Sequence, residues 1–206
     1  MSAIGILLAG GASSRLPAGK LEAHIPSALA ELRGRPELAG VTVADAAYET
    51  LAAAVGRVVV LGEPKLSAPA ECVADQRPGE GPAASLSDLL TGSHLEALPN
   101  ETRVLILAAD APFAPPLLLG LMAAAQSSVV ITADEPLPIA TSLGALRAAV
   151  ALAPLPRLRD LAAALSAVPL DPRIVARLDP LGSALADIDT TDDLAAGAPM
   201  SEQTYE

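Results

Sequence analysis

Residues 4–20 read I-G-I-L-L-A-G-G-A-S-S-R-L-P-A-G-K, and this stretch decides the fold. Its first part, residues 4–8, is a short and mostly apolar run bounded by small residues, which is typical of a buried parallel strand. Gly10 and Gly11 follow shortly after it. Because glycine has no side chain, the backbone there can approach a ligand closely and point its N–H groups at an anion. The stretch therefore predicts a strand followed by an anion-binding turn.

Two cations, Arg15 and Lys20, follow the glycines, and no acidic residue precedes Glu22 although the whole chain is acidic. A guanidinium can bind phosphate oxygens through its planar fork, and an ammonium can act as a point charge beside them. This local excess of positive charge indicates a site for a triphosphate. The alternative is a glycine-rich turn between a strand and a helix whose charges are solvated.

The familiar phosphate loops do not fit the stretch. A Walker loop requires glycine where this chain has Ser14, and Ser or Thr where Leu21 follows Lys20. The G-x-G-x-x-G spacing of dinucleotide-binding proteins is absent as well, because alanine follows the Gly-Gly pair. A different class of nucleotide-binding protein is therefore expected.

Composition limits what the chain can do. With 206 residues, 51% of them hydrophobic, it is long enough for one sizeable core and is expected to be ordered. Its formal net charge of -11 would repel a nucleic-acid duplex. Tyr48, Phe113 and Tyr205, its only aromatic residues, are too few to bind bases by stacking. We therefore expect no nucleic-acid partner.

The remaining composition points to a cytoplasmic protein without a membrane partner. Cys72 is the only cysteine, so an internal disulfide is excluded and a small buried side chain is expected. The first apolar run is too short for a signal peptide, and no apolar stretch approaches the roughly 20 residues that cross a bilayer. His24 and His94 are widely separated and lack matching partners, which favours surface positions for both.

Strand-like and helix-like segments alternate at short spacing, which predicts an α/β fold with a mostly parallel sheet and helices on both faces. We expect strands at residues 4–8, 58–61, 71–74, 104–108 and 129–132. An additional strand is expected at 138–143, with an antiparallel direction as one alternative. We expect helices at 37–54, 83–98, 116–125, 144–152 and around Leu161, and a short terminal helix capped by Thr190 or Thr191. Residues 27–33 fit a short helix or a strand.

Acidic residues follow several of these strands, at the edge where open α/β sheets bind ligands: Asp75, Asp110, and the pair Asp187 and Asp189. A carboxylate there is costly to bury unless it is paired or bound to metal. Magnesium prefers one or two carboxylates with phosphate oxygens and water, and Asp110 with Asp189 would satisfy it. The alternatives are a helix cap before Pro112 for Asp110, a solvated capping cluster for the pair, and a turn role for Asp75.

The segment L-A-G-G-A-S-S-R-L at residues 8–16 resembles the opening signature of the MobA-like NTP transferase family, which are nucleotidyltransferases with a Rossmann-like fold. The resemblance covers nearly the whole chain in order, and the members that attach GMP to molybdenum cofactor are the most similar. Its further motifs are G-R-P at 34–36, R-V-V-V-L at 57–61, D-Q-R-P-G-E-G-P at 75–82, V-L-I-L-A-A-D-A-P-F at 104–113 and D-I-D-T-T-D-D-L at 187–194.

The resemblance implies one doubly wound domain like that of nucleotide-diphospho-sugar transferases, over residues 1–198, followed by a disordered tail at 199–206. It implies transfer of GMP from GTP to the terminal phosphate of molybdopterin or molybdenum cofactor, with release of pyrophosphate and with Mg²⁺ as cofactor. GTP and the molybdopterin compound would be its partners. Other proteins of cofactor biosynthesis, or those that deliver it to apo-molybdoenzymes, are further candidates.

The resemblance also implies roles for single residues. Arg15, Lys20 and Asp110 would carry the catalysis by positioning and charge neutralisation, and Asp110 with Asp189 would hold the metal. The nucleotide would be bound by residues of the glycine turn and the strand ends: Leu8, Ala9, Gly10, Gly11, Lys20, Asp75 and Asp110.

Three features keep alternatives open. The segment G-P-A-A-S-L at 81–86 is similar to a loop of cytidylyltransferases, so transfer of CMP to the same cofactor or to another small-molecule phosphate is the alternative activity. The distance from Lys20 to G-R-P is longer than in the family, and counting back from Arg35 puts Ser27 in the place of the lysine. We favour Lys20 with an insertion after it; with Ser27, an inactive nucleotide-binding module is the alternative. Some relatives also carry an asparagine near Gly62.

Overall fold

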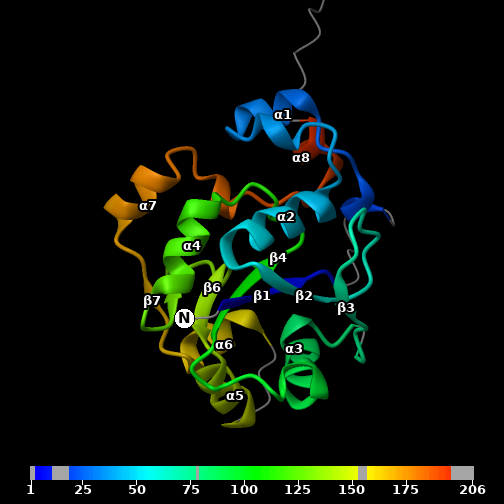
Figure 1. Cartoon of the computed structure of the whole chain (residues 1–206). Coiled ribbons are helices and arrows are strands. Elements are labelled where there is room, and N and C mark those ends of the chain that lie inside the picture. Colours follow the sequence, from blue (N-terminus) through cyan, green and yellow to red (C-terminus); the bar gives the residue numbers. More distant parts are fainter. Residues whose placement is uncertain (1–2, 11–18, 78, 153–156, 196–206) are drawn as a thin grey trace, which may run out of the picture.

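Within the residues that the structure describes, 3–10, 19–77, 79–152 and 157–195, the computed structural model is built around a seven-stranded sheet (Figure 1). The strands lie in the order β3-β2-β1-β4-β6-β5-β7. They are β1 Ala3–Leu8, β2 Arg57–Leu61, β3 Glu71–Val73, β4 Arg103–Ala108, β5 Val129–Val130, β6 Ile139–Ser142 and β7 Val168–Pro169. The predicted tail at 199–206 lies outside the described residues.

The strand directions confirm a mostly parallel sheet. β1 pairs in parallel with β2 and β4, and β2 pairs in parallel with β3. β6 runs antiparallel to both β4 and β5, which confirms the antiparallel alternative for residues 138–143. β5 covers only the first half of the predicted strand at 129–132. β7, which pairs with β5, has no counterpart among the predicted strands, because two residues that include a proline show no strand pattern.

Helices cover both faces of the sheet, as predicted. In Figure 1, α2 (Val43–Val55) and α4 (Pro116–Ala124) lie on one face, and α3 (Pro82–Thr91), α5 (Leu143–Leu152) and α6 (Leu158–Ala164) lie on the other. The shorter elements are α1 Ser27–Leu32, α7 Pro172–Leu178, α8 Thr191–Ala195, η1 Lys20–Glu22, η2 Pro36–Leu38, η3 Ser93–Leu95 and η4 Ser183–Leu185. Among the described residues, no helix has both the length and the apolar character that spanning a membrane requires.

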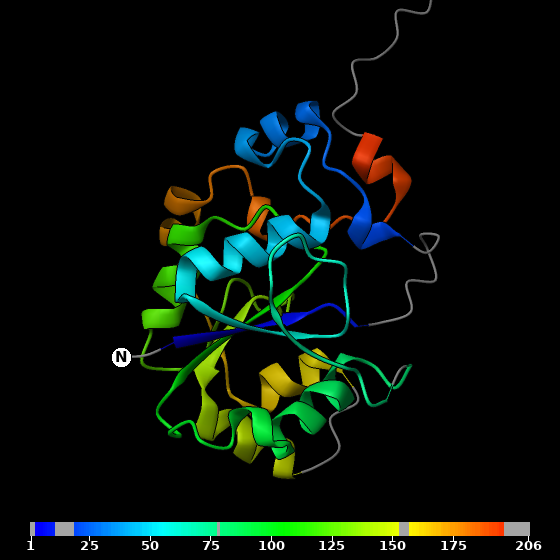
Figure 2. The same cartoon turned by 45° about the vertical axis from the view of Figure 1, so that its right-hand side comes forward.

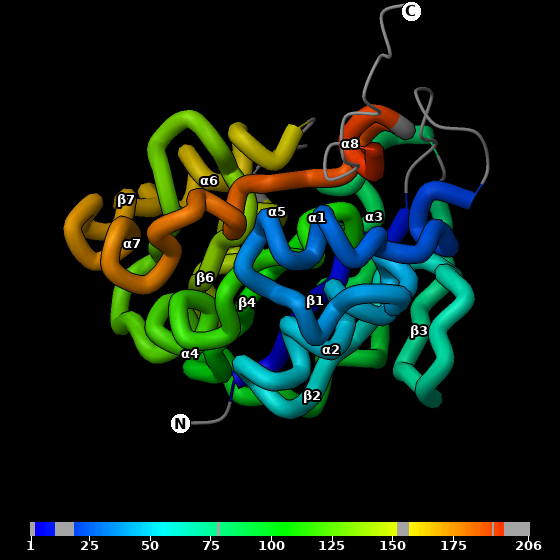
Figure 3. Tube along the Cα trace, turned by 90° about the horizontal axis from the view of Figure 1, so that it is seen from above, coloured from blue at the N-terminus to red at the C-terminus, as the bar shows by residue number. Residues whose placement is uncertain are grey.

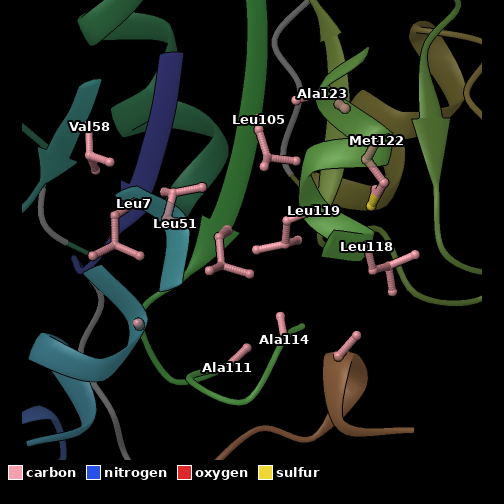
Figure 4. Packing of buried hydrophobic residues seen from close by; sticks show 14 of the residues in the cluster. Leu7, Leu51, Val58, Leu105, Ala111, Ala114, Leu118, Leu119, Met122 and Ala123 are labelled. Carbon is pink, nitrogen blue, oxygen red and sulfur yellow. The ribbon is translucent and has the colours of Figure 1, made fainter. Parts of the chain in front are cut away.

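Alternate residues of the central strands face two separate apolar cores. Ile6 of β1 belongs to the core formed with α3 and α5, whereas Leu7 belongs to the core formed with α2 and α4. Figure 4 shows this second core, in which Leu7 and Leu51 lie on one side and Leu119 of α4 on the other. Burying a leucine contributes about 1.5–3 kcal/mol, so these two layers fix the central strands and the ends from which the site is built.

A third apolar cluster lies beside the end of β4 and joins distant segments. It contains Ile25 and Leu29 from the region after η1, Phe113 from the loop after β4, and Ile188 from the segment before α8. Phe113 is 1% exposed. α1 and α8 both lie on the side of the molecule that faces the viewer in Figure 3, and Figure 2 shows them above the sheet. The cluster therefore packs the segment after η1 and the segment before α8 together beside the end of β4.

Two predicted helices are shorter than expected. The helix predicted at 37–54 begins only at Val43, because Thr42 caps it by accepting a hydrogen bond from the Asp45 N–H at 3.2 Å. Gly40, at a φ of 76°, turns the chain between η2 and this helix. The helix predicted at 83–98 ends at Thr91, and η3 follows it as a separate turn. Residues 27–32 form a helix, which decides between the two alternatives for that segment.

Candidate active site

The glycine turn continues from β1 at the carboxyl edge of the sheet, between β2 and β4. The Ala9 N–H donates to the Leu61 carbonyl at 2.9 Å, and the Ala109 N–H donates to the Leu8 carbonyl at 3.0 Å. Leu8 is buried, while Ala9 and Gly10 are half-buried. These three predicted nucleotide-binding residues therefore lie at the edge where α/β sheets bind ligands.

Gly62, just beyond β2, allows the end of that strand to approach the turn closely. Its φ is +117°, and a Cβ at this position would lie 2.8 Å from the carbonyl carbon of Ala9 and from the nitrogen of Gly10. A real Cβ does not approach backbone atoms so closely. The asparagine that some relatives carry near this position consequently has no room at residue 62.

Asp75 lies beside Gly10, two residues beyond β3. A Cβ on Gly10 would lie 3.2 Å from Asp75 Oδ2, so this carboxylate oxygen faces the glycine turn. The other oxygen, Oδ1, accepts hydrogen bonds from Ser85 Oγ at 2.6 Å and from the Arg77 N–H at 3.0 Å. The structure therefore places Asp75 with Leu8, Ala9 and Gly10, at one end of the candidate site.

Arg77 fixes the loop between β3 and α3. Its Nε and Nη2 bind the Asp88 carboxylate at 2.8 and 2.9 Å, and Nη2 also donates to the Ala84 carbonyl at 2.8 Å. Planar guanidinium geometry suits this double contact. Neither Arg77 nor Ser85 is among the predicted site residues. The position of Ser85 in the first turn of a helix, directly after the G-E-G-P turn, is the sequence signal that identifies it.

The Lys20 ammonium lies between two carboxylates that come from distant parts of the chain. Lys20 Nζ is 2.8 Å from Asp110 Oδ2 and 2.7 Å from Asp189 Oδ1. The lysine side chain is 10% exposed, and the aspartate side chains are 31% and 36% exposed. Two carboxylates face one ammonium, so the formal charge of these three side chains together is negative, which favours the approach of a cation.

Backbone contacts bring Asp189 to Asp110. The carbonyl of Asp110 accepts a hydrogen bond from the Ile188 N–H at 2.8 Å. The Asp189 and Thr190 N–H groups donate to Asp193 Oδ2 at 2.9 and 2.6 Å, and the Asp193 N–H donates to Thr190 Oγ1 at 3.2 Å. This reciprocal arrangement is a capping box at the start of α8. Thr190 is thus the capping residue of the predicted pair, and it holds Asp189 at the site.

The charges of this group act on one another. Burial by itself lowers the pKa of Lys20, but the hydrogen bonds and attraction of Asp110 and Asp189 outweigh burial and raise that pKa above its ordinary value of 10.5. Desolvation, followed by repulsion from Asp189 and Asp110, raises the pKa of Asp187. The side chain of Asp187 is nevertheless exposed, so it lies at the rim of the group.

The Asp110 and Asp189 carboxylates suit a hard cation, because they already converge on one positive charge. Magnesium takes one or two carboxylates together with phosphate oxygens and water. Within the part of the chain that the structure describes, no group of three or more His, Cys, Asp or Glu side chains could hold a metal ion. An ion bound by Asp110 and Asp189 would therefore take its other ligands from a substrate or from water.

Lys20, and not Ser27, reaches the two carboxylates. Lys20 is the first residue of η1, whereas Ser27 is the first residue of α1 and is exposed. The residues between Lys20 and Gly34 form η1 and α1, which pack as a unit over Phe113. The segment after the lysine thus contains two short helical elements, which fits the expected insertion after Lys20.

The other predicted residues have simpler surroundings. His24 is exposed, with Nδ1 2.8 Å from a backbone carbonyl, and His94 lies on the surface with Nδ1 3.9 Å from a glutamate oxygen. Cys72 is exposed, and the prediction of a buried side chain is wrong because β3 is an edge strand and this residue faces outward from it. Gly11 and Arg15 lie outside the described residues.

Comparison with protein families gives one match. The family model for the MobA-like NTP transferase domain matches residues 5–171. This range covers the sheet almost completely and includes Lys20, Asp75 and Asp110, but it ends before Asp189. No curated protein matches the chain in sequence.

Solved structures share the fold over nearly the whole chain. Molybdopterin-guanine dinucleotide biosynthesis protein A from Archaeoglobus fulgidus is 18% identical, with a TM-score of 0.63 over 94% of this chain and 96% of its own. A nucleotidyl transferase from Methanothermobacter thermautotroptrophicus is 19% identical, with a TM-score of 0.57 over 95% of each chain. The 2-C-methyl-D-erythritol 4-phosphate cytidylyltransferase of Francisella tularensis is 15% identical, with a TM-score of 0.50 over 95% of this chain and 98% of its own. The TM-scores and coverages show a shared fold, and identities this low show the fold alone.

Proposed function

Since the chain belongs to the MobA-like NTP transferase family and is a nucleotidyltransferase, we propose that it transfers GMP from GTP to the terminal phosphate of molybdopterin or molybdenum cofactor. The observation that carries the proposal is the ammonium of Lys20 held between Asp110 and Asp189, just beyond the end of β4, whose neighbour β1 leads into the glycine turn. Such a group can receive a triphosphate and its counter-ion together. The name of the Archaeoglobus fulgidus protein supports the choice of acceptor.

The proposed reaction is a single displacement. A phosphate oxygen of the acceptor attacks the α-phosphorus of GTP and forms a new P–O bond. The bond from that phosphorus to the oxygen that bridges to the β-phosphate breaks, and its electron pair leaves with pyrophosphate. No side chain forms a covalent intermediate, so the protein contributes positioning and charge neutralisation.

The side chains have distinct proposed roles. The backbone at Ala9 and Gly10 approaches the nucleotide, with Asp75 beside it. Lys20 exchanges carboxylate oxygens for phosphate oxygens when the triphosphate enters, and Arg15 is proposed as a second phosphate ligand. Asp110 and Asp189 would hold Mg²⁺, which supplies charge neutralisation for the phosphates when it is bound.

Pyrophosphate release tests the proposal directly. Purified protein with Mg²⁺ and molybdopterin is titrated with GTP and, in parallel, with CTP, and pyrophosphate and the dinucleotide product are measured. We expect turnover with a preference for GTP. Absence of turnover with both nucleotides, together with retained GTP affinity, would instead identify a nucleotide-binding module without transfer activity.

Cytidylyl transfer is the second candidate, and one contact favours it. The G-P-A-A-S-L segment at 81–86 supplies Ser85, whose hydroxyl binds Asp75 next to the glycine turn. The fold is also shared with the Francisella tularensis cytidylyltransferase. A clear preference for CTP in the parallel titration would identify CTP, and not GTP, as the donor. The proposed roles of Lys20, Asp110 and Asp189 would be unchanged.

A further inference from the structure

The loop that carries Asp110 obtains part of its hydrogen bonding from other segments. Buried backbone carbonyls need a donor, because leaving one unpaired is costly. Near the start of the loop, the Ala108 carbonyl accepts from the Ala111 N–H at 3.2 Å. Two residues later, the Asp110 carbonyl accepts a hydrogen bond from the Ile188 N–H at 2.8 Å. One of these donors lies within the loop and the other lies far along the chain.

At the far end of the same loop, two side chains take over as donors. Thr50 Oγ1 on α2 donates to the Pro112 carbonyl at 3.1 Å. Arg35 Nη1 donates to the Ala114 carbonyl at 3.0 Å. Every second carbonyl from residue 108 to residue 114 is thus held. The last two contacts are long-range and depend on single side chains, so a substitution can remove them without changing the loop sequence.

Arg35 connects both of these contacts. Its Nη2 donates to Thr50 Oγ1 at 3.3 Å, and its Nε donates to Glu37 Oε1. Thr50 is 1% exposed, and the Arg35 side chain is 14% exposed, so water competes poorly for these bonds. Each of the three acceptors is bound by a different nitrogen of the guanidinium group, which lysine cannot reproduce with one nitrogen.

The insertion after Lys20 delivers Arg35 to this position. α1 ends at Leu32, and Gly34, two residues later, has a φ of +68°. The Gly34 N–H donates to the Glu31 carbonyl at 2.9 Å, and the Arg35 N–H donates to the Ala30 carbonyl at 2.8 Å. This pair of bonds is a Schellman motif, in which glycine takes the left-handed conformation. The motif sets the direction in which the chain leaves α1 and therefore the direction of Arg35.

We propose that Arg35, acting through Thr50, is a positioning residue that holds the loop after β4 so that the Asp110 carboxylate faces Lys20 and Asp189. Arg35 itself contacts loop backbone and Thr50, and it acts on the site only through them. The meaning of this role for catalysis rests on the proposed nucleotidyl transfer. The effect on the loop does not, and it can be measured without any substrate.

Hydrogen exchange of single backbone amides tests the effect on the loop. The probes are the Ala111 and Ile188 amides, which bind carbonyls at the start of the loop. In Arg35→Lys and Thr50→Val we expect at least about tenfold faster exchange at these two amides, and unchanged exchange at the Leu7 amide in β1. Thr50→Ser keeps the hydroxyl and should restore protection. Unchanged exchange at both loop amides, or equal acceleration in β1, would overturn the proposal.

The matched control is Arg57→Lys. Arg57 also binds a carboxylate through its fork, since its Nε and Nη2 lie 3.2 and 3.0 Å from Glu71 Oε2. It lies at the first residue of β2, at the opposite end of the strand from the site, and is exposed. We expect no change at the Ala111 and Ile188 amides in this variant. A change equal to that in Arg35→Lys would show a general effect of losing an arginine and would refute the specific role.

Metal binding and kinetics provide the second readout. With Mn²⁺ as the probe, followed by electron paramagnetic resonance in the presence of GTP, Arg35→Lys and Thr50→Val should bind the ion about 10- to 100-fold more weakly. The value of kcat should fall with little change in the KM for the acceptor. In the double variant the losses should not add, because both substitutions remove one connected set of contacts. If the losses of the two single variants added fully in the double variant, Arg35 and Thr50 would act independently, which would contradict the proposal.

The two proposals fail in different ways. If the wild-type protein transfers neither GMP nor CMP, the proposed function fails, while faster exchange at the loop amides in Arg35→Lys still supports the positioning role. If the wild-type protein is active and Arg35→Lys keeps wild-type kcat, metal affinity and amide protection, the positioning role fails and the proposed function stands.

Discussion

The ends of β3 and β4 each present an aspartate to the candidate site, but the two aspartates are held in different ways. Asp75 accepts hydrogen bonds from the neutral groups of Ser85 and the Arg77 backbone, both within ten residues along the chain. Asp110 faces the Lys20 ammonium, 90 residues away in sequence, and shares it with Asp189. The first arrangement is local and neutral; the second is long-range and ionic.

This difference indicates a division of labour. A carboxylate fixed by neutral donors from the same short segment of the chain keeps its orientation whether or not a ligand is present, which suits recognition of a nucleotide. A carboxylate that shares a cation can exchange that cation for another, which suits metal and phosphate binding. Substitutions at the β4 end should therefore affect chemistry, and substitutions at the β3 end should affect nucleotide affinity.

Asp110→Asn should produce the largest effect. Removing this charge weakens the hold on a cation at the site, and metal stabilisation of a transition state is worth several kcal/mol, so we expect kcat to fall about 100- to 1,000-fold. The thermal midpoint should change little, because the side chain is partly exposed. Steady-state pyrophosphate release over a range of Mg²⁺ concentrations measures this. Wild-type rates would refute the metal role of the β4 end.

Lys20→Met should produce the next largest effect and separates Lys20 from Ser27. We expect kcat/KM for the nucleotide to fall about 10- to 100-fold, since one charge-assisted contact worth about 1.5–3 kcal/mol is lost. Ser27→Ala, at an exposed position, should stay close to wild type.

For Lys20→Met, the direction of the change in metal affinity is a further test. Without the ammonium, Asp110 and Asp189 lose their shared partner. In the absence of nucleotide, Lys20→Met should therefore bind Mn²⁺ more tightly than the wild-type protein does, as measured by calorimetry. Weaker binding would show that Lys20 supports the metal site and does not compete for it.

Ser85→Ala should affect the β3 end alone. Loss of the 2.6 Å hydrogen bond to Asp75 should weaken nucleotide binding by about 1 kcal/mol, or roughly fivefold in Kd, with Mn²⁺ affinity unchanged. Ser87→Ala on the same helix serves as the control. A loss of metal affinity as large as that in Asp110→Asn would remove the distinction between the two strand ends.

Asp45→Asn should have the smallest effect, on stability only, and extends the comparison to a carboxylate outside the site. Burial raises the pKa of Asp45, but hydrogen bonds from the Ser67 N–H, Thr42 Oγ1 and Ser67 Oγ lower it by more, so the net shift is downward. This contribution is present above about pH 3.8, the ordinary value, and disappears as the pH falls through the lower folded-state value.

The measurement for Asp45→Asn is urea unfolding at several pH values. We expect a loss of about 1 kcal/mol in the free energy of unfolding at pH 7, and a difference that shrinks below pH 4. If the difference in the free energy of unfolding stayed constant from pH 7 to below pH 4, the hydrogen bonds to Asp45 would not be stabilising its ionised form.

Much of the fold is predictable from the sequence because its signals are local. The apolar run at residues 4–8 and the one before Asp110 form buried central strands, as expected. The helix after Pro115 is also placed within a residue of the expected range. The ends of the two shortened helices are not predictable in this way. Thr42 caps the start of one helix and Gly92 the end of the other, but the helical spacing of apolar residues continues on both sides of each.

The same distinction between local and long-range signals applies to the candidate site. Position at a strand end identifies Asp75 and Asp110 from sequence alone, because parallel strands bring their carboxyl ends to one edge. The same expectation is wrong for Asp187 and Asp189, because no described strand directly precedes them, and the Ile188 N–H bond to the Asp110 carbonyl brings their segment to that edge. The roles of Arg35 and Thr50 depend on contacts with distant segments, and no spacing between the residues involved reveals such contacts. The contact of Lys20 with both carboxylates likewise depends on the three-dimensional path of the chain, which the sequence does not show.

The bond between the Ile188 N–H and the Asp110 carbonyl affects the order of events during synthesis. β1, β2 and β4 leave the ribosome well before residue 188, so a nascent chain can assemble the centre of its sheet early. Its second carboxylate, Asp189, arrives only when the last described segment docks over Phe113. A growing chain would therefore acquire its scaffold first and complete the group of Lys20, Asp110 and Asp189 last. Under the proposed function, an unfinished chain would then lack part of the site that acts on the nucleotide.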